Sequence, residues 1–145
     1  MNTQEMFETT ESCIMNTYGR FPVAIDHGMG AAFYSPEGRK YLDFTSGIGV
    51  NCLGTADPGW VQAVADQAGK LGHISNLYYN EPSAKLAQTL CSRTGMNKVF
   101  FANGGGEANE GMIKLARKYS FDKYGQGRAT IITLKQSFHG RTITT

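Results

Sequence analysis

The chain has few cysteines and no long hydrophobic run, and each absence excludes a class of protein. Its three cysteines, Cys13, Cys52 and Cys91, are an odd number without CxxC spacing, so neither a disulfide framework nor a zinc site is supported. The three histidines lack metal-ligand spacing as well. No stretch approaches the ~18 consecutive apolar residues of a transmembrane helix. We therefore expect no metal site and no membrane span.

Positive charge is sparse too. The chain has 14 Lys and Arg residues and 12 Asp and Glu residues, and the basic residues are scattered without a basic run. This distribution gives no argument for nucleic-acid binding. Residues 1–11 contain three acids and no base, unlike the basic start of a secretory signal peptide. These absences predict a cytoplasmic protein without nucleic-acid or membrane partners.

Two common phosphate-binding loops, GxxxxGK[ST] and a GxGxxG that opens a helix, are absent. In their place, residues 103–110 read NGGGEANE between an apolar run at 99–102 and a helical pattern over 107–124. Glycines let the backbone approach an anion, and a helix N-terminus offers free N–H donors and partial positive charge. The pattern predicts a phosphate site, and a tight turn remains the alternative.

Two acids complicate that prediction. Glu107 and Glu110 stand near the start of the helix, where their charges would repel a phosphate unless the side chains turn away. We interpret them as part of a solvated face, because the apolar residues of this helix form the opposite stripe.

A second group of residues follows a buried strand expected at 129–134. The sequence then continues SFHGRT over residues 137–142, beyond the strand's carboxyl end, where open parallel sheets bind ligands. Phe138 can stack on a planar ring, and Arg141 can hold a carboxylate with two hydrogen bonds. Taken alone, Phe138 fits a core position equally well, and Arg141 fits a solvated loop.

The remaining patterns predict an α/β chain, and its 41% hydrophobic residues are enough to bury one modest core. In the first part of the chain, apolar periodicity and turn signals predict a helix or arm over 1–20 and an antiparallel meander over 22–44 with turns at 27–28 and 36–38. Helices are predicted next, over 57–72 and 82–93. The last part is predicted to form two parallel strands, 97–102 and 129–134, on either side of a helix over 107–124.

These features, in this order and spacing, resemble the class III pyridoxal-phosphate (PLP) aminotransferases. Further motifs resemble the acetylornithine branch of that family: NTYGRFP at 16–22, YLDF at 41–44, SGIGVN at 46–51 and SNLYY at 75–79. The resemblance implies the PLP-dependent transferase fold of type I. Residues 1–55 would then form the N-terminal arm and small-domain strands, and residues 56–145 the first part of the large, PLP-binding domain.

The resemblance also implies roles for particular residues. Gly105 and Gly106 match the positions whose backbone N–H groups bind the cofactor phosphate. Phe138 matches the aromatic residue stacked on the pyridine ring, and Arg141 the arginine that recognises a substrate carboxylate. Gly104 departs from the family, which usually has Ser there, and removes a hydroxyl donor worth about 1 kcal/mol.

The activity implied is transfer of the terminal amino group of N-acetylornithine to 2-oxoglutarate through PLP, in arginine biosynthesis, by a homodimer. The family's Schiff-base lysine has no equivalent among the lysines present, so no catalytic residue is assigned and the 145-residue chain alone is expected to be inactive. Two alternatives stay open. One is a related class III transaminase acting on ornithine, succinylornithine or 4-aminobutyrate, and the other is a non-catalytic phosphate-binding fragment.

Overall fold

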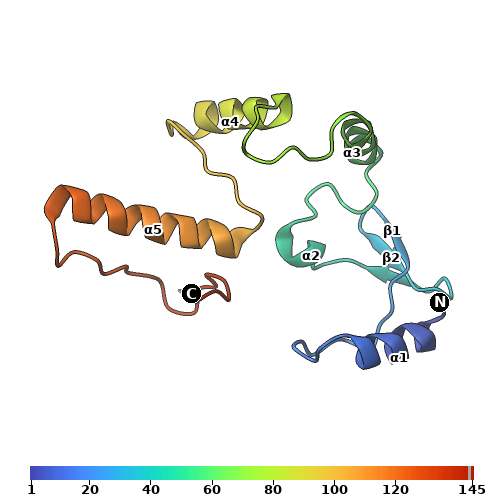
Figure 1. Cartoon of the computed structure of the whole chain (residues 1–145). Helices are drawn as coiled ribbons and strands as arrows, with labels where there is room; N and C mark the ends of the chain where they lie inside the picture. Colours follow the sequence, from blue (N-terminus) through green and yellow to red (C-terminus); the bar gives the residue numbers. More distant parts are fainter. Residues whose placement is uncertain (144) are drawn as a thin grey trace. The chain divides into compact units, whose positions relative to one another are not determined.

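The computed structural model describes residues 1–143 and 145. The chain divides into two compact units, Met1–Ser75 and Asn76–Thr145, whose elements can be followed by colour in Figure 1. Among the described residues, every helix is too short or too polar to serve as a membrane span.

The first unit begins with helix α1, Thr3–Cys13, which confirms the helix predicted within residues 1–20. The helix starts at a capping box: the Asn2 side chain accepts from the Glu5 N–H at 2.9 Å, and the Glu5 carboxylate accepts from the Asn2 N–H at 3.0 Å. These two bonds satisfy N–H groups that have no partner inside a helix.

Glu37 connects the start of α1 to the rest of the unit. Its carboxylate accepts hydrogen bonds from the Thr3 backbone N–H at 3.0 Å and the Thr3 hydroxyl at 2.7 Å. The hydrogen bonds from Thr3 favour the ionised carboxylate and lower the pKa of Glu37 from 4.5 to about 2. A side chain 34 residues away thus fixes the N-terminal helix.

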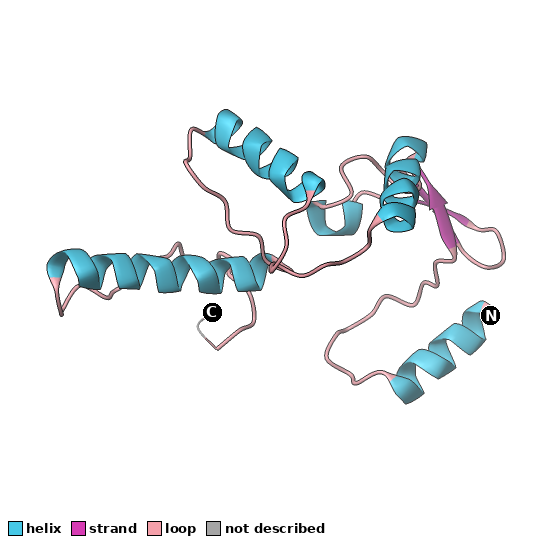
Figure 2. Ribbon diagram, turned by 45° about the horizontal axis from the view of Figure 1, so that its top comes forward, coloured by secondary structure: helices cyan, strands magenta, loops and turns pink. Residues whose placement is uncertain are grey.

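Three short strands form an antiparallel meander, as predicted for residues 22–44: β1, His27–Met29; β2, Ala32–Tyr34; and β3, Lys40–Leu42. The small sheet is drawn in magenta in Figure 2. A turn at 36–38 joins β2 to β3, with the Gly38 N–H donating to the Ser35 carbonyl at 2.9 Å. That predicted turn is confirmed.

The turn predicted at residues 27–28 is wrong. His27 and Gly28 belong to β1, where they pair with Tyr34 and Phe33. The His27 ring stacks on the Tyr34 ring with centroids 4.9 Å apart, a cross-strand contact that stabilises the pairing. The chain reverses later, at Gly30, whose φ of 57° suits glycine.

A short turn labelled α2, Ser46–Gly49, follows the sheet, and its backbone is left-handed. Ser46 and Ile48 adopt φ values of 46° and 66°, which is strained for residues with a Cβ. The Asp43 carboxylate supports the entry to this turn by accepting from the Thr45 hydroxyl and N–H, both at 2.8 Å. The Thr45 hydroxyl is the largest cause of the lowered pKa of Asp43.

Three longer helices agree with the sequence. Helix α3, Pro58–Lys70, begins with Asp57 accepting from the Trp60 N–H at 2.8 Å. In the second unit, α4 spans Glu81–Thr94 and α5 spans Gly105–Tyr124. Gly95 ends α4 with a φ of 73°, the left-handed cap that glycine provides most easily. The predicted helices over 57–72, 82–93 and 107–124 are therefore confirmed.

The parallel strands predicted at 97–102 and 129–134 are not formed. Within the part of the chain that the structure describes, both segments are irregular and pair with no strand. A parallel strand is defined by the neighbour to which it hydrogen-bonds, and apolar, β-branched sequence alone does not supply one. The predicted right-handed crossover is accordingly absent from residues 1–143 and 145.

The described residues do not form the modest core that the composition would allow. Among the described residues, the buried side chains are Ala24, Ala32 and Ser35, all in the first unit. The apolar stripes that indicated the helices remain largely exposed, with Trp60 at 57% and Leu115 at 71%. The periodicity correctly identified helices, but the described chain brings no partner surface to cover them.

Candidate functional site

The start of α5 has the geometry of an anion site. Gly104 is the N-cap, with an extended backbone and no side-chain hydrogen bond to the helix. The first bond inside the helix runs from the Ala108 N–H to the Gly104 carbonyl at 3.0 Å. The N–H groups of Gly105 and Gly106 precede that bond and belong to the set that a helix leaves unpaired.

The space beside Gly104 and Gly105 is open. A Cβ atom placed on either glycine would meet nothing within 4 Å apart from the adjacent backbone, whereas one on Gly106 would lie 3.4 Å from the Thr142 Cγ2. Backbone donors beside open space are what a phosphate group requires, so the residues present fit the phosphate of PLP.

The two acids near the start of this helix each have a partner. The Glu107 carboxylate reaches back and accepts from the Asn103 N–H at 2.8 Å, one residue before the N-cap. The Glu110 carboxylate accepts from the Thr142 hydroxyl at 2.5 Å and lies 3.8 Å from the Lys114 ammonium. With its side chain 17% exposed, Glu110 is not part of a solvated face, and that interpretation is corrected.

The loop that contains Phe138 and Arg141 lies against this helix start. The Asn109 amide donates to the His139 carbonyl at 2.6 Å, one residue before the Glu110 contact. Gly140, at a φ of 121°, comes so close that a Cβ there would be 3.0 Å from the Gly106 Cα. The structure therefore brings together the glycine segment and the SFHGRT segment, which are separated by about 30 residues in sequence.

Phe138 and Arg141 lie in one short loop. Phe138 is 79% exposed in this chain. The Arg141 guanidinium lies over the Phe138 ring, with its Cζ 5.8 Å from the ring centroid, a cation–π distance. The aromatic ring and the guanidinium thus come from one short loop.

Sequence reasoning missed the side chains that hold this loop, namely Asn109, Glu110 and Thr142. The available signal was the ANE of residues 108–110, two polar residues placed one turn after the glycines. A loop that binds a ligand beside a helix packs on the near face of that helix, so polar residues on this face are candidates to hold the loop.

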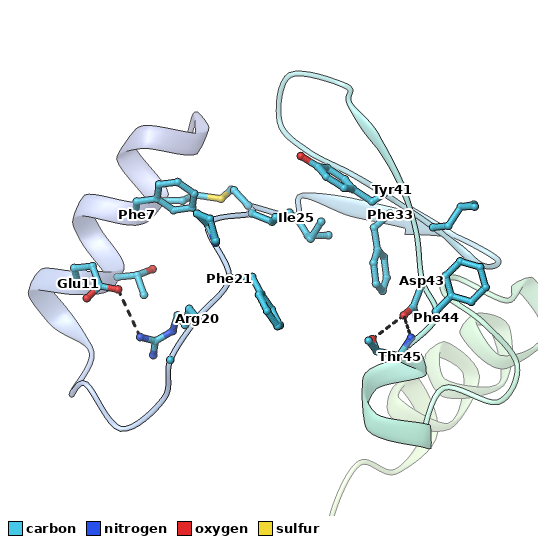
Figure 3. A pocket seen from close by; sticks show the side chains of 17 residues that line it. Phe7, Glu11, Arg20, Phe21, Ile25, Phe33, Tyr41, Asp43, Phe44 and Thr45 are labelled. Carbon is cyan, nitrogen blue, oxygen red and sulfur yellow. Dashed lines mark hydrogen bonds and ion pairs between the residues drawn. The ribbon is translucent and has the colours of Figure 1, made fainter.

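A separate groove of about 850 Å³ lies within the first unit, between α1 and the sheet. Figure 3 shows Phe7 on the helix side and Phe33 and Tyr41 on the strand side. A Glu11–Arg20 ion pair with an N–O distance of 3.7 Å forms part of its lining. None of the residues predicted for cofactor or substrate lines this groove.

The described residues contain no cluster of potential metal ligands, and their cysteines are unpaired. Their His, Cys, Asp and Glu side chains form no group of three that could hold a metal ion. The cysteines are free thiols: Cys13 and Cys52 are exposed, and Cys91 is half-buried.

Comparison with known proteins identifies the family. The chain belongs to the class-III aminotransferases, whose family model matches residues 13–145. This confirms the resemblance found in the sequence and the fold class of a type I PLP-dependent transferase.

Individual relatives show which class-III aminotransferases the chain resembles. The chain is 56% identical, over all 145 residues, to an acetylornithine aminotransferase from Haemophilus ducreyi, of which it covers 37%. Its fold resembles the crystal structure of acetylornithine aminotransferase from Elizabethkingia anophelis, with 35% identity and a TM-score of 0.82 over 88% of this chain and 33% of that one. It also resembles an ornithine aminotransferase from Toxoplasma gondii, with 26% identity and a TM-score of 0.92 over 99% of this chain and 34% of that one.

The chain thus spans about a third of the length of the relatives that it matches. The matched part contains the glycine segment, Phe138 and Arg141.

Proposed function

We propose that the protein containing this chain is a PLP-dependent aminotransferase that moves the terminal amino group of N-acetylornithine to 2-oxoglutarate, in arginine biosynthesis. The observation that carries the proposal is the contact between the glycine start of α5 and the loop of Phe138 and Arg141. Family membership and 56% identity to an acetylornithine aminotransferase support it.

Three kinds of contact would hold the reactants. The N–H groups of Gly105 and Gly106 would donate to the PLP phosphate, assisted by the positive end of the α5 dipole. The exposed Phe138 ring would support the pyridine ring. The Arg141 guanidinium would bind a substrate carboxylate through two parallel hydrogen bonds. When bound, PLP supplies the electron sink and carries the amino group between the two substrates.

The remaining machinery belongs to the other part of such an enzyme. We propose that the Schiff-base lysine and the acid facing the pyridine nitrogen lie outside this chain, so the 145 residues alone would not transaminate. We further propose that residues 1–55 belong to the arm and small domain and residues 56–145 to the PLP-binding domain. The active form would be a cytoplasmic homodimer.

The role of Arg141 has a direct test. In the complete protein, Arg141→Ala should raise the KM for 2-oxoglutarate or N-acetylornithine by about 10- to 100-fold, because a charged hydrogen-bond pair is worth roughly 1.5–3 kcal/mol. The PLP absorbance should stay intact. Arg128→Ala is the matched control, since Arg128 lies over Tyr124 at 4.7 Å from the ring and away from the loop. An unchanged KM in the Arg141 variant would overturn the assignment.

A second candidate is ornithine itself as the amino donor. It is favoured by the TM-score of 0.92 to the Toxoplasma gondii ornithine aminotransferase. Turnover with N-acetylornithine, ornithine, succinylornithine and 4-aminobutyrate as separate donors decides among these substrates. A third result, PLP binding without an adduct that borohydride can trap, would instead support a non-catalytic phosphate-binding protein.

A further inference from the structure

The loop over residues 138–142 contains both exposed and half-buried residues. Phe138 and Arg141 are exposed, whereas His139, Gly140 and Thr142 are half-buried against α5. The two residues that would touch ligand are therefore flanked by residues fixed to the helix.

Two adjacent residues of α5 provide the fixed points. The Asn109 side-chain amide donates to the backbone carbonyl of His139 in the loop, at 2.6 Å. The Glu110 carboxylate accepts a hydrogen bond from the side-chain hydroxyl of Thr142 in the loop, at 2.5 Å. Both contacts are partly buried, so they are less screened by water than contacts on an open surface.

The position of the loop matters because α5 also presents the phosphate donors. Gly106 lies at the close approach to Gly140, one turn before Asn109 and Glu110. The same two turns of α5 carry the Gly105 and Gly106 donors and the side chains that hold the loop. They therefore set the distance from the proposed phosphate site to the Phe138 ring and the Arg141 guanidinium, which would act on the same ligand. A small misplacement of positioning groups is costly in catalysis.

We propose that Asn109 and Glu110 are positioning residues, which fix the Phe138–Arg141 loop relative to the glycine start of α5. The proposal rests on the proposed function of that loop, and it assigns no contact with substrate or cofactor to either residue. Lys114, 3.8 Å from the Glu110 carboxylate, partly balances a negative charge that would otherwise disfavour a phosphate nearby.

Thr142 offers an isosteric test in the complete protein. Thr142→Val keeps the shape but removes the hydroxyl that Glu110 accepts from, and Thr142→Ser restores the hydroxyl. Asn109→Ala removes the second anchor. Lys118→Ala is the matched control, because Lys118 lies on the same helix and pairs with Asp122 instead of the loop.

Two readouts are measured. The first is hydrogen exchange of the amides of residues 138–143 in the PLP-free protein, which reports loop order independently of activity. The second is the pair of constants kcat and KM with 2-oxoglutarate, together with PLP absorbance.

Thr142→Val and Asn109→Ala should each speed exchange and raise KM by about tenfold, the effect of losing one charged or buried hydrogen bond. Thr142→Ser should return both readouts to within about twofold of the wild type, and Lys118→Ala should change neither.

The outcomes separate this proposal from the proposed function. Unchanged exchange in both anchor variants overturns the positioning role, even if the wild type transaminates. Equal effects of Thr142→Val and Thr142→Ser would also overturn the Glu110 contact as its basis. If the wild type neither binds PLP nor transaminates, the proposed function fails, and the exchange data alone still decide whether the loop is held. Should Asn109→Ala fail to fold, the Thr142 pair decides.

Discussion

The two units differ in the source of their backbone hydrogen bonds. In Met1–Ser75, the strands β1, β2 and β3 pair with one another through short turns, and an isolated bridge joins Gly30 to Thr55. In Asn76–Thr145, the described residues form the helices α4 and α5, and the segments between and after these helices make no ladder.

This difference follows from the kind of sheet that each sequence encodes. An antiparallel meander finds each partner a few residues away, so a short chain can complete it. A parallel strand requires a partner reached through a long crossover, and the segments at 97–102 and 129–134 find none among residues 1–143 and 145. The relatives contain about two further thirds of chain, and their added length is where such partners would come from.

Hydrogen exchange tests this difference between the two units, and its expected effect is the largest of these predictions. In the 145-residue chain, amides at 98–102 and 130–134 should exchange near the rate of an open chain, whereas those of β2 should be slowed. In the complete protein, the same two segments should be protected at least about a thousandfold, the effect of a sub-global opening energy near 4 kcal/mol. Equal protection of these segments in both forms would contradict the comparison.

A pair of glycine substitutions sharpens the account of the first unit. Gly54 has a φ of 79°, and a Cβ there would lie 2.9 Å from the Gly30 carbonyl oxygen. Gly38 has a similar φ of 82° but open space around it. Gly38→Ala should therefore cost only the left-handed strain, about 1 kcal/mol, and Gly54→Ala about 2 kcal/mol or more, because it also disrupts the Gly30–Thr55 bridge.

Chemical denaturation of the complete protein, followed by circular dichroism, measures both variants. A Gly54→Ala cost equal to that of Gly38→Ala would show that the bridge region shifts freely and does not hold the unit together.

The smallest effect concerns the tie between α1 and the sheet. The Glu37 pKa falls from 4.5 to about 2 because Thr3 donates two hydrogen bonds to the ionised carboxylate. A depressed acid pKa stabilises the folded form fully above pH 4.5, and the stabilisation is lost as the pH falls toward 2. Exchange at the Thr3 amide should therefore report a loosening of α1 on acidification.

Glu37→Gln should loosen the start of α1 already at neutral pH and remove its pH dependence over that window. Glu8→Gln is the control, because Glu8 accepts from Gln4 within the same helix and does not touch the sheet. Carboxyl NMR titration gives the Glu37 pKa directly, and a value near 4.5 would refute the tie.

Elements governed by local signals were predictable from the sequence. Asp57 and Pro58 mark the start of α3, Gly95 marks the end of α4, and both outcomes depend on bonds within a few residues. The first reversal of the meander was misplaced because His27 and Gly28 look like a turn in isolation. Their pairing with Tyr34 and Phe33 is a cross-strand property that local composition does not contain.

The residues proposed to face a ligand could be named from the sequence, whereas the residues that support them could not. Glycines before a helix, an aromatic residue and an arginine each suggest a chemistry of their own. Asn109 and Glu110 bind only other parts of the protein, so their role exists only once the loop and helix are brought together. The interpretation of Glu110 as solvated failed for that reason.

The uncapped start of α5 has a consequence for how the protein registers its ligand. Gly104 has no side chain with which to complete the first turn, so an anion at Gly105 and Gly106 would take the place of the missing cap. Occupancy and order in that turn are then thermodynamically linked, each increasing the population of the other. Helix α5 would in this way serve as a sensor, whose first turn reports whether the site is filled.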